Sequence, residues 1–183
     1  MDRMPPIAPD AMTSAQKATA QQFRAKRGVD IDGPFVPLLR SPGLLEPLHQ
    51  VGLHCRYNNA LGLHLSEFII LNVARRFNQS VEWAIHAPIA EKAGVAPQTI
   101  EALLEGRRPP AMSADETMIY DAMREIWDGH GWSDATYGAV QKRFGDAGII
   151  DLVGTVGYYT TLAMVMNVTR TKAPGGYRMP PLR

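Results

Sequence analysis

Cysteine is nearly absent from this sequence, since Cys55 is the only one among 183 residues. A lone thiol can form neither an intrachain disulfide nor a thiolate metal cluster within one chain. A chain without disulfides is typical of a reducing compartment, so we expect a cytoplasmic protein.

An excess of charge of one sign is lacking as well. The chain carries 19 Lys and Arg against 18 Asp and Glu, which leaves a formal net charge of +1. Nucleic-acid-binding domains usually show a basic stripe, whereas the strongest basic clusters here are two arginine pairs, at positions 75 and 76 and at 107 and 108. We expect no nucleic-acid partner.

The chain also has no hydrophobic run long enough to span a bilayer. The most apolar segment, residues 152–166, is interrupted by glycines and threonines and falls short of the roughly 20 residues that a membrane helix needs. Residues 1–14 hold three prolines and two aspartates in place of the apolar core of a secretory signal. We expect a buried core helix at 152–166, no export signal and no membrane partner.

Sustained alternation of apolar and polar residues, the pattern of a half-buried strand, is missing too. Apolar residues recur instead at helical spacing, which predicts an all-α fold of about seven helices. The expected helices cover residues 11–27, 42–58, 67–94 (as one kinked helix or two), 97–106, a segment that begins after Ser113, 133–144 and 149–169, with Ser41, Ser66, Ser113 and Ser133 as N-caps. We expect residues 1–32 to form an N-terminal arm, 33–170 a single helical domain and 171–183 an extended tail.

Three residues stand out as candidates for acid/base chemistry. Glu82 and His86 are four apart, so on a helix they share a face, and a carboxylate there can orient the imidazole or raise its pKa. Glu67 stands in an otherwise apolar run, where a carboxylate needs a partner, and His86 is one candidate. A histidine flanked by carboxylates can have a pKa near 7, as a proton relay requires. The alternatives are a solvated surface pair for Glu82 and His86 and a first-turn residue for Glu67.

Four further residues are candidates for substrate binding. Arg56 and His54, beside Tyr57, lie near the end of the helix expected at 42–58 and can hold a substrate carboxylate. The alternative is that they only complement the helix dipole. Trp83 follows Glu82 and is either a pocket residue or a core residue.

Four segments together resemble the carboxymuconolactone decarboxylase and alkylhydroperoxidase D superfamily. They are GPFVPLLRSPGLLEPL, HCRYNNALGLHLSEFIILNVARRF, EWAIHAPIAEKAGVAPQTIEAL and GIIDLVGTVGYYTTLAMVMNV, which together extend over residues 33–168. The resemblance implies an alkylhydroperoxidase D-like helical fold. It also implies a homo-oligomer, a trimer or hexamer with a dimer as the alternative, and pockets between helices.

The alkylhydroperoxidase D branch of that superfamily uses a glutamate, a Cys-x-x-Cys pair and a histidine four residues after the second cysteine. By position, the glutamate matches Glu67 and the histidine matches His86, whereas Gln79 and Glu82 stand where the two cysteines would be. A dithiol cycle therefore has no resolving pair. The sequence resembles the decarboxylase-like branch, in which acid/base groups carry the reaction.

That branch implies a lyase or isomerase that acts on a small carboxylated lactone or organic acid from the breakdown of aromatic compounds. In this interpretation His86 is the general acid/base, Glu82 orients it, Glu67 is a second relay member and Arg56 holds a carboxylate. The interpretation calls for a small-molecule substrate and for no cofactor and no metal.

Three alternatives to this interpretation remain open at this point. In the first, Glu67, Glu82 and His86 bind a divalent metal ion. In the second, Cys55 acts with an external thiol in an antioxidant role. In the third, the protein is a non-catalytic binding or scaffold subunit.

Overall fold

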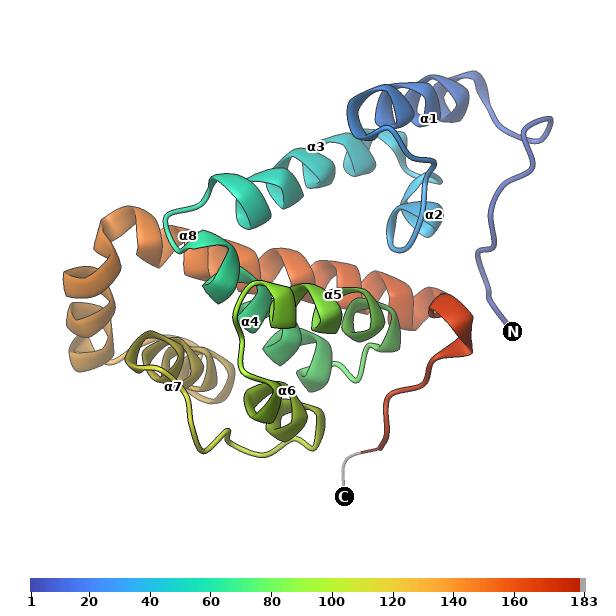
Figure 1. The fold of residues 1–183 in the computed structure, drawn as a ribbon. Helices are drawn as coiled ribbons and strands as arrows, with labels where there is room; N and C mark the ends of the chain where they lie inside the picture. The colour runs from blue at the N-terminus through green and yellow to red at the C-terminus, as the bar shows by residue number, and fades with distance from the viewer. Residues whose placement is uncertain (182–183) are drawn as a thin grey trace.

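The computed structural model describes residues 1–181 and is all-helical, with no strand in that range. Eight α-helices and two short helices of other types follow one another along the chain (Figure 1). Their bounds are α1 Ser14–Arg27, α2 Phe35–Leu38, α3 Pro42–Leu53, the π-helix η1 His54–Asn58, α4 Gly62–Arg76, α5 Ser80–Lys92, α6 Pro97–Leu104, α7 Ala114–Gly129, α8 Asp134–Thr169 and the 3-10 helix η2 Pro174–Gly176.

Helix α4 forms the centre of the fold. Every residue from 65 to 75 is buried, including the polar residues Ser66, Glu67, Asn72 and Arg75. It packs against α5, α6, α7 and α8. A carboxylate on such a helix, as at Glu67, is necessarily surrounded by protein.

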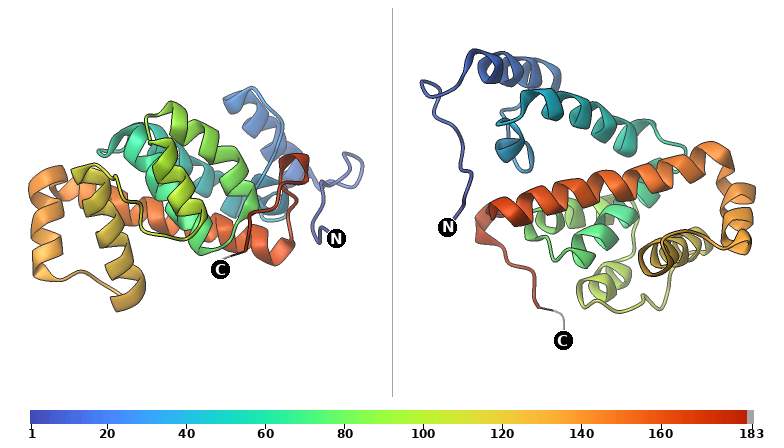
Figure 2. Two further views of the ribbon diagram at one scale, coloured as in Figure 1. Left: turned by 60° about the horizontal axis from the view of Figure 1, so that its bottom comes forward. Right: turned by 180° about the vertical axis from the view of Figure 1, so that it is seen from behind.

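Helix α8 separates two groups of helices. In the two opposite views, α1 and α3 lie on one side of α8 and α4 to α7 on the other (Figures 1 and 2). Gly145 has a φ of 70° and interrupts the helix, which confirms the predicted break between the segments 133–144 and 149–169. One residue makes this break, because glycine adopts a positive φ at no steric cost and so can bend the helix without a longer loop. By length and apolar composition α8 would also pass as a membrane span, and half of its most apolar 18-residue window is buried inside the protein. One helix of this kind is weak evidence for a membrane span.

Of the four predicted helix caps, Ser113 and Ser133 are confirmed, whereas Ser66 and Ser41 make no capping bond. Ser113 and Glu116 form the expected capping box, and Ser133 caps α8. Ser66, in contrast, is not a cap: it lies in the second turn of α4, and its hydroxyl donates to the Gly62 carbonyl at 2.9 Å. The cap is supplied by Asn59, whose Oδ1 accepts from the amides of residues 61 and 62 at 2.8 and 3.0 Å. Ser41 precedes α3 but makes no side-chain capping bond.

Two helices, α4 and α5, occupy residues 62–92, which settles the choice between one kinked helix and two. Asn78 adopts a left-handed φ of 49° between them. Gln79 caps α5 by accepting from the amide of Val81 at 2.7 Å. The tight turn brings the two helices side by side, so that residues 19 apart in sequence can meet.

The terminal segments of the described chain lie against the helical body. The amide of Arg3 donates to the carbonyl of Thr169 at 2.8 Å, at the end of α8. Phe23 of α1 is fully buried and belongs to the main hydrophobic core. The C-terminal segment, expected to be extended, contains the short helix η2 and buries Met179; residues 182 and 183 lie outside the described part.

Candidate acid/base site

Glu67, Glu82 and His86 meet in the interior, between α4 and α5. His86 Nδ1 lies 2.6 Å from Glu67 Oε2, and Nε2 lies 3.3 Å from Glu82 Oε2. The three residues are 0 %, 3 % and 5 % exposed in the order Glu67, Glu82 and His86. The alternatives of a solvated surface pair and of a first-turn glutamate are therefore excluded for these residues.

The imidazole of His86 is held as a cation. Burial alone lowers its pKa, but the hydrogen bonds and charges of Glu67 and Glu82 outweigh burial and raise the pKa of His86 to about 9. This corrects the expectation of a pKa near 7. The physical reason is that a carboxylate lies at each ring nitrogen, so that both N–H groups of the protonated ring are used. At neutral pH His86 stores a proton.

Arg56 adds a second positive charge beside this array. It lies in the π-helix η1, and its Nε is 3.4 Å from Glu67 Oε1, while its guanidinium lies over the Tyr57 ring, 4.8 Å from the ring centroid. Two cations thus face two carboxylates in a region shielded from water. Such a balance makes the burial of four charged groups tolerable.

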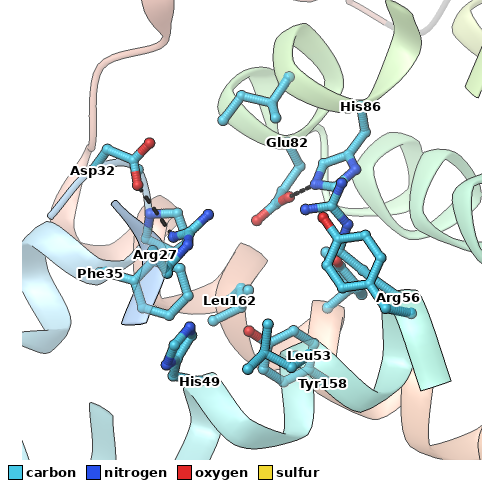
Figure 3. A pocket seen from close by; sticks show the side chains of 16 residues that line it. Arg27, Asp32, Phe35, His49, Leu53, Arg56, Glu82, His86, Tyr158 and Leu162 are labelled. Carbon is cyan, nitrogen blue, oxygen red and sulfur yellow. Dashed lines mark ion pairs between the residues drawn. The ribbon is translucent and has the colours of Figure 1, made fainter. Parts of the chain in front are cut away.

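The array opens onto a cavity of about 120 Å³ that is open to solvent on one side. A cavity of roughly 150 Å³ binds a molecule the size of benzene, so this one suits a ligand with a single small ring. Glu82 and His86 line the cavity (Figure 3). Glu67 does not line it and contacts the imidazole at Nδ1. The other polar and aromatic lining residues are Arg27, Asp32, Phe35, His49, Arg56, Tyr57, Tyr158 and Tyr159. Glu82 Oε1 has no hydrogen-bond partner among the described residues and is the carboxylate oxygen left for a ligand.

The structure brings only some of the predicted substrate-binding residues to this cavity. Arg56 and Tyr57 line it. Trp83 is 4 % exposed and packs in the hydrophobic core, because its side chain leaves α5 on another face than Glu82 and His86. His54 is also placed elsewhere: its Nε2 lies 2.7 Å from Asp151 Oδ1, and the same carboxylate accepts from the amide of Ala60 at 2.7 Å. Asp151 therefore ties α8 both to His54 in η1 and to the loop before α4.

Two consecutive tyrosines were not predicted. Tyr158 and Tyr159 lie on α8, line the cavity, and pack edge to face at 5.0 Å between ring centroids. The centroid of the Tyr159 ring also lies 5.4 Å from that of the His86 ring. Burial, followed by the charge of Glu82, raises the pKa of both hydroxyls, so they remain neutral hydrogen-bond donors. In the sequence they appear only as aromatic members of an apolar helix.

Gly52 on α3 makes room for Tyr158, since a Cβ built at Gly52 would lie 2.3 Å from the tyrosine Oη. We predict that Gly52→Ala destabilises the protein by about 1–3 kcal/mol through overpacking. Gly43→Ala, on the same helix with open space around its Cβ, is the matched control and should be neutral or stabilising by up to about 1 kcal/mol. Urea unfolding measures both, and equal midpoints for the two variants would contradict the tight contact.

Two alternatives from the sequence find little support in this geometry. Among residues 1–181 no group of three His, Cys, Asp or Glu side chains is arranged to hold a metal ion, and each nitrogen of His86 already faces a carboxylate. Cys55 is 2 % exposed, and burial raises the pKa of its thiol. A buried thiol of raised pKa is a poor nucleophile.

The raised pKa of His86 makes stability depend on pH in a defined direction. An unfolded histidine has a pKa of about 6.5, so the stabilisation is complete below that pH and is lost as pH rises through about 9. We predict that the unfolding free energy of the wild type, relative to His86→Gln, falls by up to about 3 kcal/mol between pH 6.5 and 9. Urea titrations at several pH values measure the difference. Parallel profiles for the two proteins would refute the prediction.

Comparisons of the chain with protein families, with curated proteins and with solved structures found no match.

Proposed function

We propose that the protein is an acid/base enzyme of the lyase or isomerase type, similar to carboxymuconolactone decarboxylases, that transfers a proton on a small carboxylated lactone or organic acid. The observation that carries the proposal is the buried His86 between two carboxylates, with Glu82 facing a ligand-sized cavity. A stored proton at the wall of a ligand-binding cavity is what such chemistry requires.

The roles of the three residues follow from their positions. Glu67 lies 2.6 Å from Nδ1 and does not line the cavity, so it orients the imidazole and keeps it charged. Glu82 lines the cavity, 3.3 Å from Nε2. This order differs from the one expected from the sequence, in which Glu82 was the orienting group. In the proposal Glu82 exchanges the proton with the substrate, and His86 replenishes it.

For a carboxylated unsaturated lactone the reaction is a decarboxylation. The bond between the ring carbon and the carboxylate breaks, CO2 leaves, and the electron pair moves into the conjugated carbonyl to give an enolate. The His86 and Glu82 pair then delivers one proton to carbon, and water restores that proton. The neutral hydroxyls of Tyr158 and Tyr159 are suited to donate to the carbonyl oxygen as negative charge develops there. No step calls for a cofactor.

The wider proposal includes an alkylhydroperoxidase D-like fold, a cytoplasmic location and a homo-oligomer, a trimer or hexamer with a dimer as the alternative. The all-helical architecture and the close approach of Glu67 and His86 support the fold. The single buried cysteine supports a reducing compartment.

Turnover of 4-carboxymuconolactone in D2O, followed by 1H NMR, tests the proposed function. The expected result is loss of CO2 with one deuterium incorporated at carbon. A panel of carboxylated lactones and β-keto acids extends the search for the substrate. Wild-type protein that leaves the whole panel unchanged would overturn the proposal.

A further inference from the structure

The cavity has a second polar region, opposite the acid/base array. Arg27, Phe35 and His49 gather on one side, while Glu82, His86 and Arg56 lie on the other (Figure 3). The first group comes from α1, α2 and α3, which lie on the other side of α8 from α5. A ligand in the cavity therefore has one end near His86 and one near Arg27.

Polar atoms of Arg27 and His49 lack partners. His49 is 2 % exposed, and neither of its ring nitrogens has a hydrogen-bond partner among the described residues; the same is true of Arg27 Nη1. A buried donor without a partner costs free energy. An oxyanion in this part of the cavity would supply acceptors for both side chains.

The surroundings of Arg27 and His49 fix their positions but do not neutralise the charge. The guanidinium lies 5.0 Å from the centroid of Phe23 and 5.3 Å from that of Phe35, and His49 packs against the same two rings. Asp32 is the nearest acidic group, at 3.5 Å from Arg27 Nη1, and its side chain is 65 % exposed. Because the Asp32 carboxylate is solvated, the pair contributes little at this distance. Arg27 thus keeps most of its attraction for an anion.

His49 is a neutral donor at pH 7. Burial, followed by the charge of Arg27, lowers its pKa. The neutral imidazole has one N–H, which can donate to a carboxylate oxygen next to the arginine. Arg56, the residue that the sequence suggested as carboxylate anchor, already contacts Glu67.

We propose that Arg27 and His49 form the carboxylate-binding subsite of this cavity and so set the orientation of an organic acid, with its carboxylate at Arg27 and its reacting carbon at Glu82. The inference rests on the proposed function for the reacting end, but the subsite itself binds a carboxylate whether or not a reaction follows.

Binding of benzoate at pH 7, measured by calorimetry, tests the subsite, with benzamide as the neutral control of the same shape. We expect benzoate to bind more tightly than benzamide. Arg27→Met, which keeps an apolar stem against Phe23 and Phe35, should weaken benzoate binding about tenfold or more, as expected for loss of a charged hydrogen bond. Arg56→Met should weaken it by less than about threefold.

A spectroscopic readout places the bound anion. With 13C-labelled histidine, benzoate should shift the ring resonances of His49 in the wild type and not in Arg27→Met. Should Arg27→Met fail to fold by circular dichroism, Arg27→Lys keeps the charge and is expected to retain tighter binding of benzoate than of benzamide.

Several results would overturn the subsite. They are equal affinity for benzoate and benzamide, benzoate binding that is lost in Arg56→Met but retained in Arg27→Met, and an unshifted His49. The outcome is independent of turnover: benzoate bound at Arg27 in a protein that leaves every lactone unchanged would support the subsite and refute the proposed function. Lactone turnover, together with benzoate binding that Arg27→Met does not change, would support the proposed function and refute the subsite.

Discussion

Glu82→Gln is expected to reduce proton transfer to the substrate by a factor of about 10²–10⁴, the usual contribution of a positioned general acid or base. Glu82 is the carboxylate of the array that lines the cavity, and its Oε1 lacks a partner among the described residues. Glutamine preserves the shape of the side chain but cannot carry the proton from His86 to carbon. Deuterium incorporation into product, followed by 1H NMR, measures the effect.

Glu91→Gln is the matched control, because Glu91 lies on the same helix α5 and is exposed to solvent. It should turn over at the wild-type rate. Circular dichroism should show the same helical content for both variants. If the Glu82→Gln protein keeps its activity within about threefold of the wild type, Glu82 has no part in the reaction, because a general acid contributes a much larger rate factor.

Glu67→Gln is expected to cost about 3–5 kcal/mol of stability, the range seen when one member of a buried ion pair is removed. Glu67 is fully buried and faces two cationic side chains, His86 at 2.6 Å and Arg56 at 3.4 Å. The neutral amide leaves the half-buried guanidinium of Arg56 without this counter-charge. Guanidinium chloride unfolding measures the loss.

Two controls separate this effect from a general cost of substitution. Glu101→Gln, at an exposed position on α6, should stay within about 0.5 kcal/mol of the wild type. In a double-mutant cycle, Arg56→Met should cost less in the Glu67→Gln background than alone, because the charge it removes no longer has a partner. Additive effects would mean that Arg56 and Glu67 do not interact.

Local features were predictable where short-range chemistry decides them. The capping box of Ser113 and Glu116 and the break at Gly145 follow from residues within four positions of each other. Ser66 was misassigned as a cap because Asn59, seven residues earlier, binds the first amides of α4 and leaves Ser66 inside the helix. Only the path of the loop before α4 decides whether Asn59 or Ser66 caps the helix.

The acid/base array was predictable, but most of the cavity was not. Glu82 and His86 share a face by their four-residue spacing, and Glu67 needed a partner as a carboxylate in an apolar run. Arg27 and His49 reach the same cavity from α1 and α3 through long-range packing, for which no local pattern exists. The pKa of His86 could not be predicted from the sequence either, because it depends on burial and on two carboxylates acting together.

The charge of His86 is the most direct test of the proposed site, since the array functions as a proton store only if the ring is charged at neutral pH. A pH titration of the histidine side chains by 1H–15N NMR, with His86→Gln to assign the resonances, measures it without a substrate. We predict that both nitrogens of His86 stay protonated until the pH approaches about 9. A neutral ring at pH 7, with one nitrogen bare, would contradict this prediction.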